Sequence, residues 1–322
     1  MVKKVKLLYL SMKKVNLTKI LVTGAAGFIG SNVTRMLLDA GHSVTVLDNL
    51  SHGYRDNVDQ RANLVVGDIA DSRKAKLALK GIDAVIHMAG LIVVPESVKD
   101  PVSYCQNNVL GTVAFLNSMR EAGVKKIIYS SSACVYGTPD SLPIKEDAPL
   151  RPDNPYGATK AAVEVFLQAY HECYGFDVTI LRYFNPYGPG KLYPPITHAI
   201  PNFIMATLAK KPVPLYWQGE QIRDFIYIED LAQAHIDVLK LSGFNIFNLG
   251  MEKGVKIKDV VKMIFDIIGY EVPIDDLGER PGDVHANYAS SAKLKKDASW
   301  RTKVDLREGL KRTSEYYKKQ PR

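Results

Sequence analysis

A tyrosine and a lysine near the middle of the chain have the spacing of a catalytic pair. Tyr156 and Lys160 lie in the stretch NPYGATK (154–160), which opens a predicted helix, and residues four apart share one face of a helix. A phenol with a pKa of about 10 is a poor base at neutral pH, but a neighbouring ammonium group favours the phenolate. The pair could therefore take a proton from a hydroxyl group and return it.

Serines end the predicted strand that comes before this helix. The strand over residues 125–130 runs through Ser130 into Ser131 and Ser132, and a proline-rich loop follows. Ser132 could hydrogen-bond the reacting oxygen, and Lys160 could also bind the ribose hydroxyls next to a nicotinamide. A Tyr and a Lys four apart are by themselves an ordinary surface pair. The serine strand and a dinucleotide turn upstream favour a catalytic set of Ser132, Tyr156 and Lys160.

A glycine-rich turn near the beginning of the chain predicts the dinucleotide site. Residues 19–30, KILVTGAAGFIG, have the pattern of strand, tight turn and helix. Gly24 permits the turn, Gly27 lets the backbone approach a pyrophosphate, and Gly30 allows the helix to pack closely on the strand. The free N–H groups at the start of the helix then face an anion.

An acidic residue at the end of the next predicted strand favours NAD over NADP. Asp48 follows Gly30 by 18 residues, which is where a dinucleotide-binding unit places its acid. The carboxylate could accept hydrogen bonds from both adenosine ribose hydroxyls, and its charge would repel a 2′-phosphate. An ordinary glycine turn followed by a turn-forming Asp would not require this register.

Strands then alternate with helices, which predicts an α/β fold: a doubly wound parallel sheet (Rossmann) with a smaller α+β substrate lobe. We expect strands at 63–67, 83–87, 125–130, 177–181 and 245–249, and helices at 71–79, 102–122 and 156–174. Prolines interrupt the last third of the chain. We therefore expect an N-terminal extension (1–16), an NAD-binding domain (17–184 and 224–262) and a substrate lobe (185–223 and 263–322).

Two further strand ends carry polar or small residues. Asp68 could hold the adenine edge or only start a turn, and both interpretations stay open. Ala89 and Gly90 leave room for the dinucleotide. His87 has no carboxylate partner near it in the sequence, so we interpret it as a packed core histidine rather than a catalyst.

The last third supplies two arginines that we expect in loops. Arg223 and Arg280 each lie near an acid, in the stretches RDF (223–225) and RPGD (280–283). Arginine binds phosphate with two parallel hydrogen bonds, so the pair would suit a diphosphate. Two structural Arg–Asp pairs are the alternative.

Composition limits the classes of function. Apolar residues make up 46% and charged residues 24% of the chain, as in a soluble globular protein. The net charge of +8 comes from scattered Lys and Arg, which indicates a basic surface around a site for an acidic substrate rather than nucleic-acid binding. The chain has three cysteines without paired spacing: Cys105, Cys134 and Cys173. This pattern indicates a protein of the reducing cytoplasm and predicts neither a disulfide framework nor a metal site. No apolar run approaches the roughly 20 residues of a membrane span, so we expect no membrane partner.

With these motifs in place, the sequence resembles the extended short-chain dehydrogenase/reductase family and, within it, the UDP-hexose 4-epimerases. The resemblance covers residues 17 to about 315. It rests on ordered motifs: TGAAGFIG (23–30), DNLS (48–51), GDI (67–69), HMAGL (87–91), NNVLGT (107–112), SSSACVYG (130–137), YGATK (156–160), LRYFNP (181–186), RDF (223–225) and RPGD (280–283).

The resemblance implies a binding site for NAD and one for a UDP-sugar. The residues implied for NAD are Gly24, Gly27, Phe28, Ile29, Gly30, Asp48, Asn49, Asp68, Ile69, Ala89, Gly90, Asn107, Ser130, Tyr156, Lys160 and Phe184. Those implied for the substrate are Ser132, Tyr156, Asn185, Tyr216, Arg223, Arg280, Asp283 and Asn287. Phe184 would lie against the nicotinamide, Tyr216 would stack on uracil, and Asp283 would bind a uridine ribose hydroxyl.

The implied reaction is a redox-neutral epimerisation. Tyr156 as phenolate would take the proton of the sugar 4-hydroxyl while C4 passes hydride to NAD, and the rotated 4-keto sugar would receive the hydride back. Ile92 and Val93 stand where some such epimerases have a lysine, and Trp217 stands where glycine is usual, which could reshape the uridine pocket. Asn287 stands at the position that gates the 2-substituent, so we expect tolerance of UDP-N-acetylglucosamine beside UDP-glucose.

Several alternatives stay open. A UDP-glucuronate or UDP-pentose 4-epimerase would fit the same motifs, as would another reductase of nucleotide sugars. Sugar-nucleotide dehydratases tend to place acids where this chain has Ala133 and Cys134, which disfavours dehydration. A non-catalytic NAD-binding regulator is a candidate from another class.

We also expect a homodimer. In this family the helices over 102–122 and 156–174 pair across a two-fold axis. Both carry apolar residues beyond one face: Val109, Val113, Leu116, Val163, Phe166 and Leu167. Burial against the sheet would explain some of the same pattern.

Overall fold

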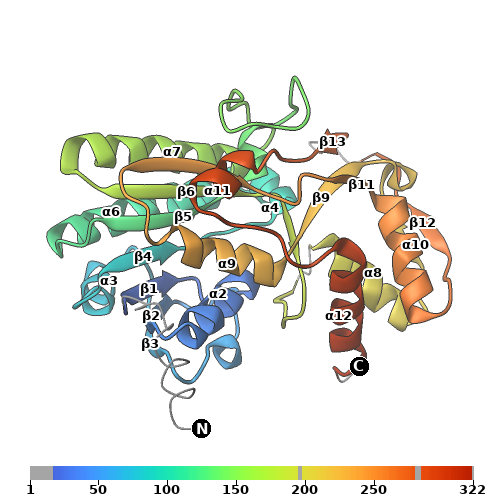
Figure 1. Ribbon diagram of the computed structural model, residues 1–322, viewed down its shortest axis with the longest axis horizontal. Helices are drawn as coiled ribbons and strands as arrows, with labels where there is room; N and C mark the ends of the chain where they lie inside the picture. Colours follow the sequence, from blue (N-terminus) through green and yellow to red (C-terminus); the bar gives the residue numbers. More distant parts are fainter. Residues whose placement is uncertain (1–16, 195–197, 280–283, 321–322) are drawn as a thin grey trace, which may run out of the picture.

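A seven-stranded parallel sheet forms the centre of the computed structural model, which describes residues 17–194, 198–279 and 284–320 (Figure 1). From one edge to the other, its strands are β10 (Phe244–Leu249), β6 (Asp177–Tyr183), β5 (Lys126–Ser132), β4 (Ala84–His87), β1 (Lys19–Thr23), β2 (Ser43–Asp48) and β3 (Asn63–Val66). Every neighbouring pair is parallel. The doubly wound parallel sheet predicted from the sequence is confirmed.

The strand order reverses between β1 and β4. The chain passes from β1 to β2 and β3 on one side, then returns to β4 and continues through β5 and β6 on the other. At such a switch point the loops after neighbouring strands diverge and leave a crevice beyond the carboxyl ends. The first and fourth strands therefore fix where a ligand can bind.

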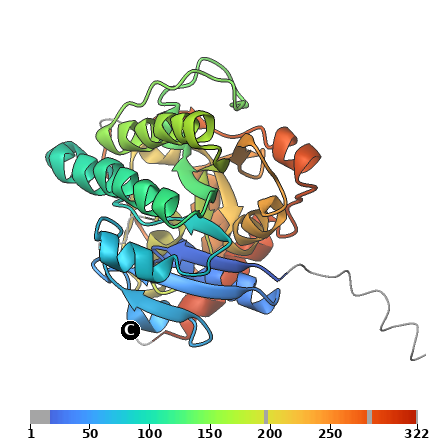
Figure 2. The same cartoon turned by 90° about the vertical axis from the view of Figure 1, so that its left-hand side faces the viewer.

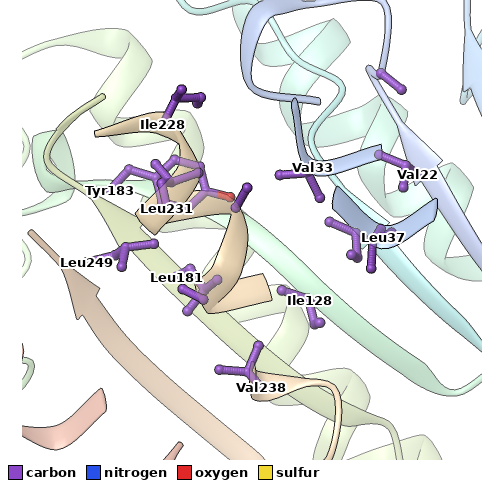
Figure 3. Close-up of a cluster of buried hydrophobic side chains, with 14 of the residues drawn as sticks. Val22, Val33, Leu37, Ile128, Leu181, Tyr183, Ile228, Leu231, Val238 and Leu249 are labelled. Atoms are coloured by element: carbon purple, nitrogen blue, oxygen red, sulfur yellow. The ribbon is translucent and has the colours of Figure 1, made fainter. Parts of the chain in front are cut away.

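Helices cover both faces of the sheet. One face carries α2 (Phe28–Asp39) and α9 (Ile228–Val238), whose Leu37 and Leu231 pack with Ile128 and Leu181 of the strands (Figure 3). All four side chains are at most 1% exposed. The other face carries α3 (Ser72–Ala78), α6 (Gly111–Glu121) and α7 (Pro155–Tyr174), and α6 and α7 run side by side (Figure 2). Burial of a leucine side chain contributes about 1.5 to 3 kcal/mol.

The long helix α7 has sequence signals at both ends. The side chain of Asn154 accepts a hydrogen bond from the backbone N–H of Gly157, and Pro155 occupies the first turn. Both features are favourable at a helix start. Gly175 ends the helix at φ 67°, a left-handed conformation that glycine adopts without strain. The caps thus fix the first turn of α7, which carries Tyr156 and Lys160.

A smaller lobe lies beside the sheet, to the right in Figure 1. Its helices α8 (Ala199–Leu208), α10 (Ile257–Ile268) and α12 (Leu306–Lys318) share one apolar cluster with the pair β8 (Val213–Leu215) and β12 (Ile274–Asp276). A second small sheet joins β7 (Asn185–Tyr187), β9 (Ile222–Tyr227), β11 (Gly254–Lys256) and β13 (Ala286–Asn287). The division into domains stays a prediction. The boundary expected between residues 262 and 263 falls inside α10, and this helix packs against α8 and α12.

The strands and helices lie close to their expected positions, with two differences. The strand β5 extends to Ser132, so all three serines belong to it. The region 102–122 is not one regular helix: α5 (Pro101–Tyr104) passes through a π-helical segment, Cys105–Leu110, into α6. Such wide turns are frequent at functional sites, and this one carries Asn107.

The apolar residues on α6 and α7 divide between core and surface. Val109, Leu116, Val163 and Leu167 are buried against the sheet, which is the alternative that the sequence left open for this pattern. Phe166 is 40% exposed. Three apolar residues not singled out from the sequence are exposed by 60% or more: Val102, Leu110 and Val165. Within the described ranges, no helix is long and apolar enough to cross a membrane.

Candidate active site

One continuous cavity of about 700 Å³ lies beyond the carboxyl ends of the sheet and reaches the smaller lobe. All residues expected to bind NAD line it: Gly24, Gly27, Phe28, Ile29, Gly30, Asp48, Asn49, Asp68, Ile69, Ala89, Gly90, Asn107, Ser130, Tyr156, Lys160 and Phe184. Ser132, Asn185, Tyr216 and Arg223 from the expected substrate set line it too. The fold thus brings residues from distant parts of the sequence around one space, although their individual roles stay predictions.

The glycine turn has the tight geometry that its sequence predicts. Gly24 has φ +73°, and a Cβ atom there would lie 2.7 Å from the backbone nitrogen of Ala89. A Cβ on Gly30 would lie 2.4 Å from the backbone oxygen of Gly24. Neither position has room for a side chain, because the turn packs against β4 and the helix packs against the turn.

The amino end of α2 can hold a phosphate group. Gly27 is its N-cap residue and makes no side-chain cap, and no acidic residue lies in the first turn. The first N–H groups of a helix lack partners within the helix, and those of Phe28, Ile29 and Gly30 belong to residues that line the cavity. These features fit a dinucleotide pyrophosphate.

Asp48 anchors the glycine turn as well as facing the cavity. Its Oδ2 accepts a hydrogen bond from the backbone N–H of Ala26 at 2.9 Å, and its Oδ1 accepts one from Leu50 at 2.8 Å. Each carboxylate oxygen has a second lone pair, so both can still accept from ribose hydroxyls. The side chain is therefore held in place before a ligand binds.

Two other strand-end residues have structural partners. Asp68 accepts hydrogen bonds from Asn49 Nδ2 at 2.9 Å and from the backbone of Ala70 at 2.8 Å, so it starts a turn and also faces the cavity. His87 is fully buried, with Nδ1 2.8 Å from the Thr23 hydroxyl and Nε2 2.9 Å from the Thr112 hydroxyl. Burial lowers the pKa of His87 to about 3. Its interpretation as a core histidine is confirmed.

Tyr156, Lys160 and Ser132 all line the cavity, and the side chains of Tyr156 and Ser132 are hydrogen-bonded to each other. Lys160 Nζ donates to the backbone oxygen of Ser130 at 2.7 Å and lies 5.9 Å from the centre of the Tyr156 ring. The other side of the ammonium group faces the ring of Tyr129, 4.9 Å away. Tyr156 is 9% exposed and Lys160 only 3%. The reactive groups therefore lie in a site from which most water is excluded.

Burial opposes the charged form of both reactive side chains. It raises the pKa of Tyr156 above its usual range, and the hydrogen bond with Ser132 acts in the opposite direction. Burial lowers the pKa of Lys160 to about 8, while the charge of Glu164 favours the ammonium form. Burial therefore acts against the lowering of the Tyr156 pKa that the nearby ammonium group was expected to give.

A buried ion pair supports the serine strand from behind. Arg182 Nη2 lies 2.6 Å from Glu164 Oε2, and both side chains are less than 5% exposed. Ser131 donates to Glu164 Oε1 at 2.5 Å, and Arg182 also donates to the Tyr136 hydroxyl at 2.7 Å. The network joins β5, β6 and α7, the three elements that carry the reactive groups or flank them.

Residues of β9 line the part of the cavity where substrate binding was predicted. Arg223 lies in this strand and not in a loop as expected, and its guanidinium donates to the backbone oxygens of Ile222 at 2.9 Å and Val284 at 2.6 Å. Asp224 faces the opposite way: its carboxylate accepts hydrogen bonds from three backbone N–H groups, those of Met251, Glu252 and Ala289. Burial raises the pKa of Asp224 to about 6. Neighbouring strand residues point to opposite faces, so these two do not form the pair that the sequence allowed.

Four other residues were expected in or near the substrate pocket, and none of them can be placed at the cavity. Arg280 and Asp283 lie outside the described residues. Asn287 is 9% exposed in β13 and does not line the cavity; its Oδ1 has no hydrogen-bond partner in the described part of the chain. Trp217 does not line the cavity either and stacks on His285 at 5.7 Å. Its φ of +47° explains why a glycine suits this position.

Some cavity residues were missed from the sequence. His198 and Asn202 lie at the start of α8, and Gln221 comes just before β9. The ring of His198 meets that of Phe28 edge-on at 5.4 Å, and burial lowers its pKa to about 4. The alternation of a strand could have placed Gln221 beside Arg223, but nothing local marks His198. Among the described residues, no cluster of His, Cys, Asp or Glu is suited to hold a metal.

A family model and the sequences of curated proteins show which known proteins this chain resembles. A model of the NAD dependent epimerase/dehydratase family matches residues 20–250. A UDP-glucose 4-epimerase from Azospirillum brasilense is 36% identical over 315 residues, covering 92% of this chain and 90% of that protein.

Two solved structures extend this similarity to the fold. The UDP-glucose 4-epimerase with UDP-glucose from Thermotoga maritima matches with a TM-score of 0.90 and 33% identity, covering 94% of this chain and 99% of the other. The UDP-N-acetylglucosamine 4-epimerase from Methanobrevibacter ruminantium M1, in complex with UDP-N-acetylmuramic acid, matches with a TM-score of 0.88 and 34% identity, covering 94% and 98%.

Proposed function

The chain belongs to the NAD dependent epimerase/dehydratase family, and from this membership we propose that it is a UDP-hexose 4-epimerase acting on UDP-glucose and UDP-galactose. The observation that carries the proposal is the continuity of the cavity. One space joins the glycine turn and Asp48 to Tyr156 and Lys160, and then to Arg223 in the smaller lobe. A dinucleotide and a nucleotide sugar can therefore meet at the phenol.

The chain's own residues account for the proton transfers. Tyr156 takes the proton of the sugar 4-hydroxyl and later returns it to the same oxygen, after the configuration at C4 has been inverted. Ser132 hydrogen-bonds this oxygen. Lys160, already placed by the backbone oxygen of Ser130, stabilises the phenolate and binds a ribose hydroxyl. Burial disfavours the phenolate, and the Lys160 ammonium group and the cationic nicotinamide of bound NAD would both favour it.

The cofactor supplies the redox chemistry. When bound, NAD accepts a hydride from C4 of the sugar and gives it back, so no net oxidation occurs. The glycine turn, the start of α2 and Asp48 would hold it. On the substrate side, Arg223 would bind the diphosphate, Tyr216 the uracil ring and Asn185 the sugar or diphosphate. The 4-keto sugar turns between the two hydride transfers, which requires contacts to the hexose that are fewer than those to the nucleotide.

Substrate range is the finer part of the proposal. Asn287 does not line the cavity, so its side chain gives no argument about volume next to the sugar. A related solved structure is that of a UDP-N-acetylglucosamine 4-epimerase, and on this ground we include UDP-N-acetylglucosamine as a second substrate. Formation of its 4-epimer, measured beside that of UDP-glucose, tests this part of the proposal.

A homodimer in the cytoplasm completes the proposal. Phe166 and Val165 on α7, together with Leu110 and Val102 before α6, leave apolar surface exposed on neighbouring helices. None of the three cysteines forms a disulfide bond, which suits a reducing compartment. Sedimentation at micromolar concentration would give the mass of a dimer, and Val165→Glu would shift it to that of a monomer.

The test of the function uses purified protein without added NAD. It is incubated with UDP-glucose, UDP-N-acetylglucosamine and UDP-glucuronate in turn, and the products are separated by chromatography. A 4-epimer without net NADH supports the proposal. UDP-glucuronate as the preferred substrate would point to the alternative 4-epimerase. No turnover of any sugar, with NAD supplied, would contradict an epimerase.

A further inference from the structure

A buried serine from a distant segment holds the backbone of Tyr156. The Tyr156 N–H group donates to the Ser97 Oγ atom at 3.2 Å, although the two residues are 59 positions apart in the sequence. Ser97 lies in the short helix α4 (Val94–Lys99), which packs against α7, and it is fully buried. Because Ser97 does not line the cavity, it can act on the reaction only through Tyr156.

The place of Tyr156 at the start of its helix explains why this contact matters. The first N–H groups of a helix have no acceptor within the helix. Pro155 carries no N–H group, and the N–H group of Gly157 donates to Asn154 Oδ1 at 2.9 Å. The N–H group of Tyr156 therefore needs an acceptor from outside α7, and Ser97 supplies it.

The Ser97 hydroxyl is itself held in place, next to the wall of the cavity. Its Oγ donates to the backbone oxygen of Val94 at 2.7 Å, which leaves its lone pairs to accept from Tyr156. The backbone N–H of Ser97 donates to the backbone oxygen of Val93 at 3.0 Å. Val93 lines the cavity, and the Tyr104 hydroxyl bonds both of its backbone groups, at 2.7 and 2.8 Å. The wall and Tyr156 are thus joined through Ser97.

The backbone oxygen of Tyr156 leads to the same wall. It accepts a hydrogen bond from Thr159 Oγ1 at 2.8 Å, and Thr159 Oγ1 accepts one from Asn108 Nδ2 at 3.1 Å. Asn108 also bonds both backbone groups of Leu91, at 2.8 and 2.9 Å, and Leu91 lines the cavity. Helix ends fray when they are not held. Here both backbone groups of Tyr156 are connected to the segment after β4.

We propose that Ser97 is a positioning residue for the proton transfer: its hydroxyl oxygen fixes the first turn of α7, so that the phenol of Tyr156 stays beside Lys160 and the reacting oxygen. The inference rests on the proposed function, because it takes Tyr156 as the group that receives the proton. Proton transfer needs heavy-atom distances of about 2.6 to 3.2 Å, and a displacement of about 1 Å can cost 10²-fold in rate. Loss of the bond should therefore slow the chemical step more than it weakens binding.

The experiment compares Ser97→Ala with the wild type, both with NAD bound and with UDP-glucose as substrate. The variant removes the acceptor, and we expect kcat to fall by about tenfold. The KM of UDP-glucose and the Kd of NAD should stay within about twofold of the wild type, because neither ligand contacts Ser97.

The pH profile of kcat separates positioning from a loss of folded protein. A phenol that is held less firmly beside the Lys160 ammonium group ionises less readily, so the acid limb of the Ser97→Ala profile should shift to higher pH. The other titratable groups close to the phenol, Cys134 and Tyr104, are the same in both proteins. A smaller folded fraction would lower kcat equally at every pH and leave the limb in place.

Ser118→Ala is the matched control. Ser118 is 2% exposed in α6, and its Oγ donates to the backbone oxygen of Ala114 in the same helix at 3.2 Å. The substitution deletes the same atom from another buried helical serine that does not line the cavity. Its kcat and its acid limb should equal those of the wild type.

Amide hydrogen exchange tests the contact in the wild type itself. An unbonded N–H group in the first turn of a helix is expected to exchange fast, whereas that of Tyr156 should be protected by Ser97. In Ser97→Ala, exchange should become faster in the first turn of α7 and stay the same in its middle.

Several results would overturn the inference. These are an unchanged kcat in Ser97→Ala, a loss confined to KM, a fall in kcat with the acid limb in place, or an equal fall in Ser118→Ala. Fast exchange of the Tyr156 N–H group in the wild type would also overturn it, even if the variant does not fold. A wild type that turns over no sugar would instead contradict the proposed function, while the exchange of Tyr156 would still report on the contact.

Discussion

Replacing Tyr156 by phenylalanine removes one oxygen atom from the centre of the cavity, and we expect kcat for UDP-glucose to fall by about 10²- to 10⁴-fold, the usual contribution of a positioned proton acceptor. That loss corresponds to about 3 to 5 kcal/mol of barrier. Because Tyr156 is only 9% exposed, the phenyl ring keeps the packing. Loss of the hydrogen bond with Ser132 should change the free energy of unfolding by about 1 kcal/mol.

Tyr129→Phe is the matched control for this loss. Tyr129 lies on β5, is 2% exposed, and its ring faces Lys160 Nζ at 4.9 Å, yet it does not line the cavity. The same atom is deleted next to the same ammonium group, so kcat should stay within about twofold of the wild type if the phenol of Tyr156 alone transfers the proton. Formation of UDP-galactose is followed by chromatography, and the NAD content and melting temperature of each variant are measured in parallel. A Tyr156→Phe enzyme with more than about a tenth of wild-type kcat, or an equal loss in Tyr129→Phe, would refute the reasoning.

Three further predictions concern the cofactor, the buried ion pair and pH. Asp48→Asn removes a negative charge from the adenosine ribose site, so the ratio of the NADP and NAD dissociation constants should fall by about tenfold in calorimetry; an unchanged ratio would contradict the role of Asp48. Glu164→Gln leaves the buried Arg182 cation unpaired and should lower the free energy of unfolding by about 3 to 5 kcal/mol in urea. The double variant Glu164→Leu/Arg182→Met should lose much less; a larger loss in the double variant would refute this account. Burial lowers the pKa of His87 to about 3 and of His235 to about 4, so the unfolded chain takes up their protons first as the pH falls below about 6.5. Stability present above that pH should be lost towards pH 4, by on the order of 3 kcal/mol per imidazole; a urea midpoint that does not decrease between pH 7 and 5, or a His235→Gln variant with the same slope, would contradict it.

Local patterns were sufficient for the Rossmann part of the molecule. The glycine turn, the acid at the end of β2 and the pair at the start of α7 are each a short stretch whose geometry follows from backbone rules. Gly24 has the positive φ that its turn needs, and Asn154 caps the helix that carries Tyr156 and Lys160. The parallel arrangement of the strands could also be predicted, because strands that alternate with helices usually form a parallel sheet with the helices packed on its faces.

The sequence was less informative where partners come from distant segments. The apolar residues of α6 and α7 could not be divided between core and surface, because both kinds recur at helical spacing; Leu116 is buried and Phe166 is exposed. The direction of the Tyr156 pKa was also beyond local reasoning. The spacing in the sequence shows that Lys160 lies next to Tyr156. The burial of Tyr156, which raises its pKa, depends on all the residues that pack around its ring.

By itself, the sequence determined the family and the parallel α/β fold, and it predicted the glycine turn and the set of Ser132, Tyr156 and Lys160, since these depend on residue types at fixed local spacing. Only the tertiary structure decided that Arg223 lies in a strand, on the opposite face from Asp224, and that His198 and Gln221 line the cavity. The physical reason is that hydrogen-bond satisfaction and burial are sums over neighbours, and the fold brings those neighbours from parts of the chain that no local pattern connects.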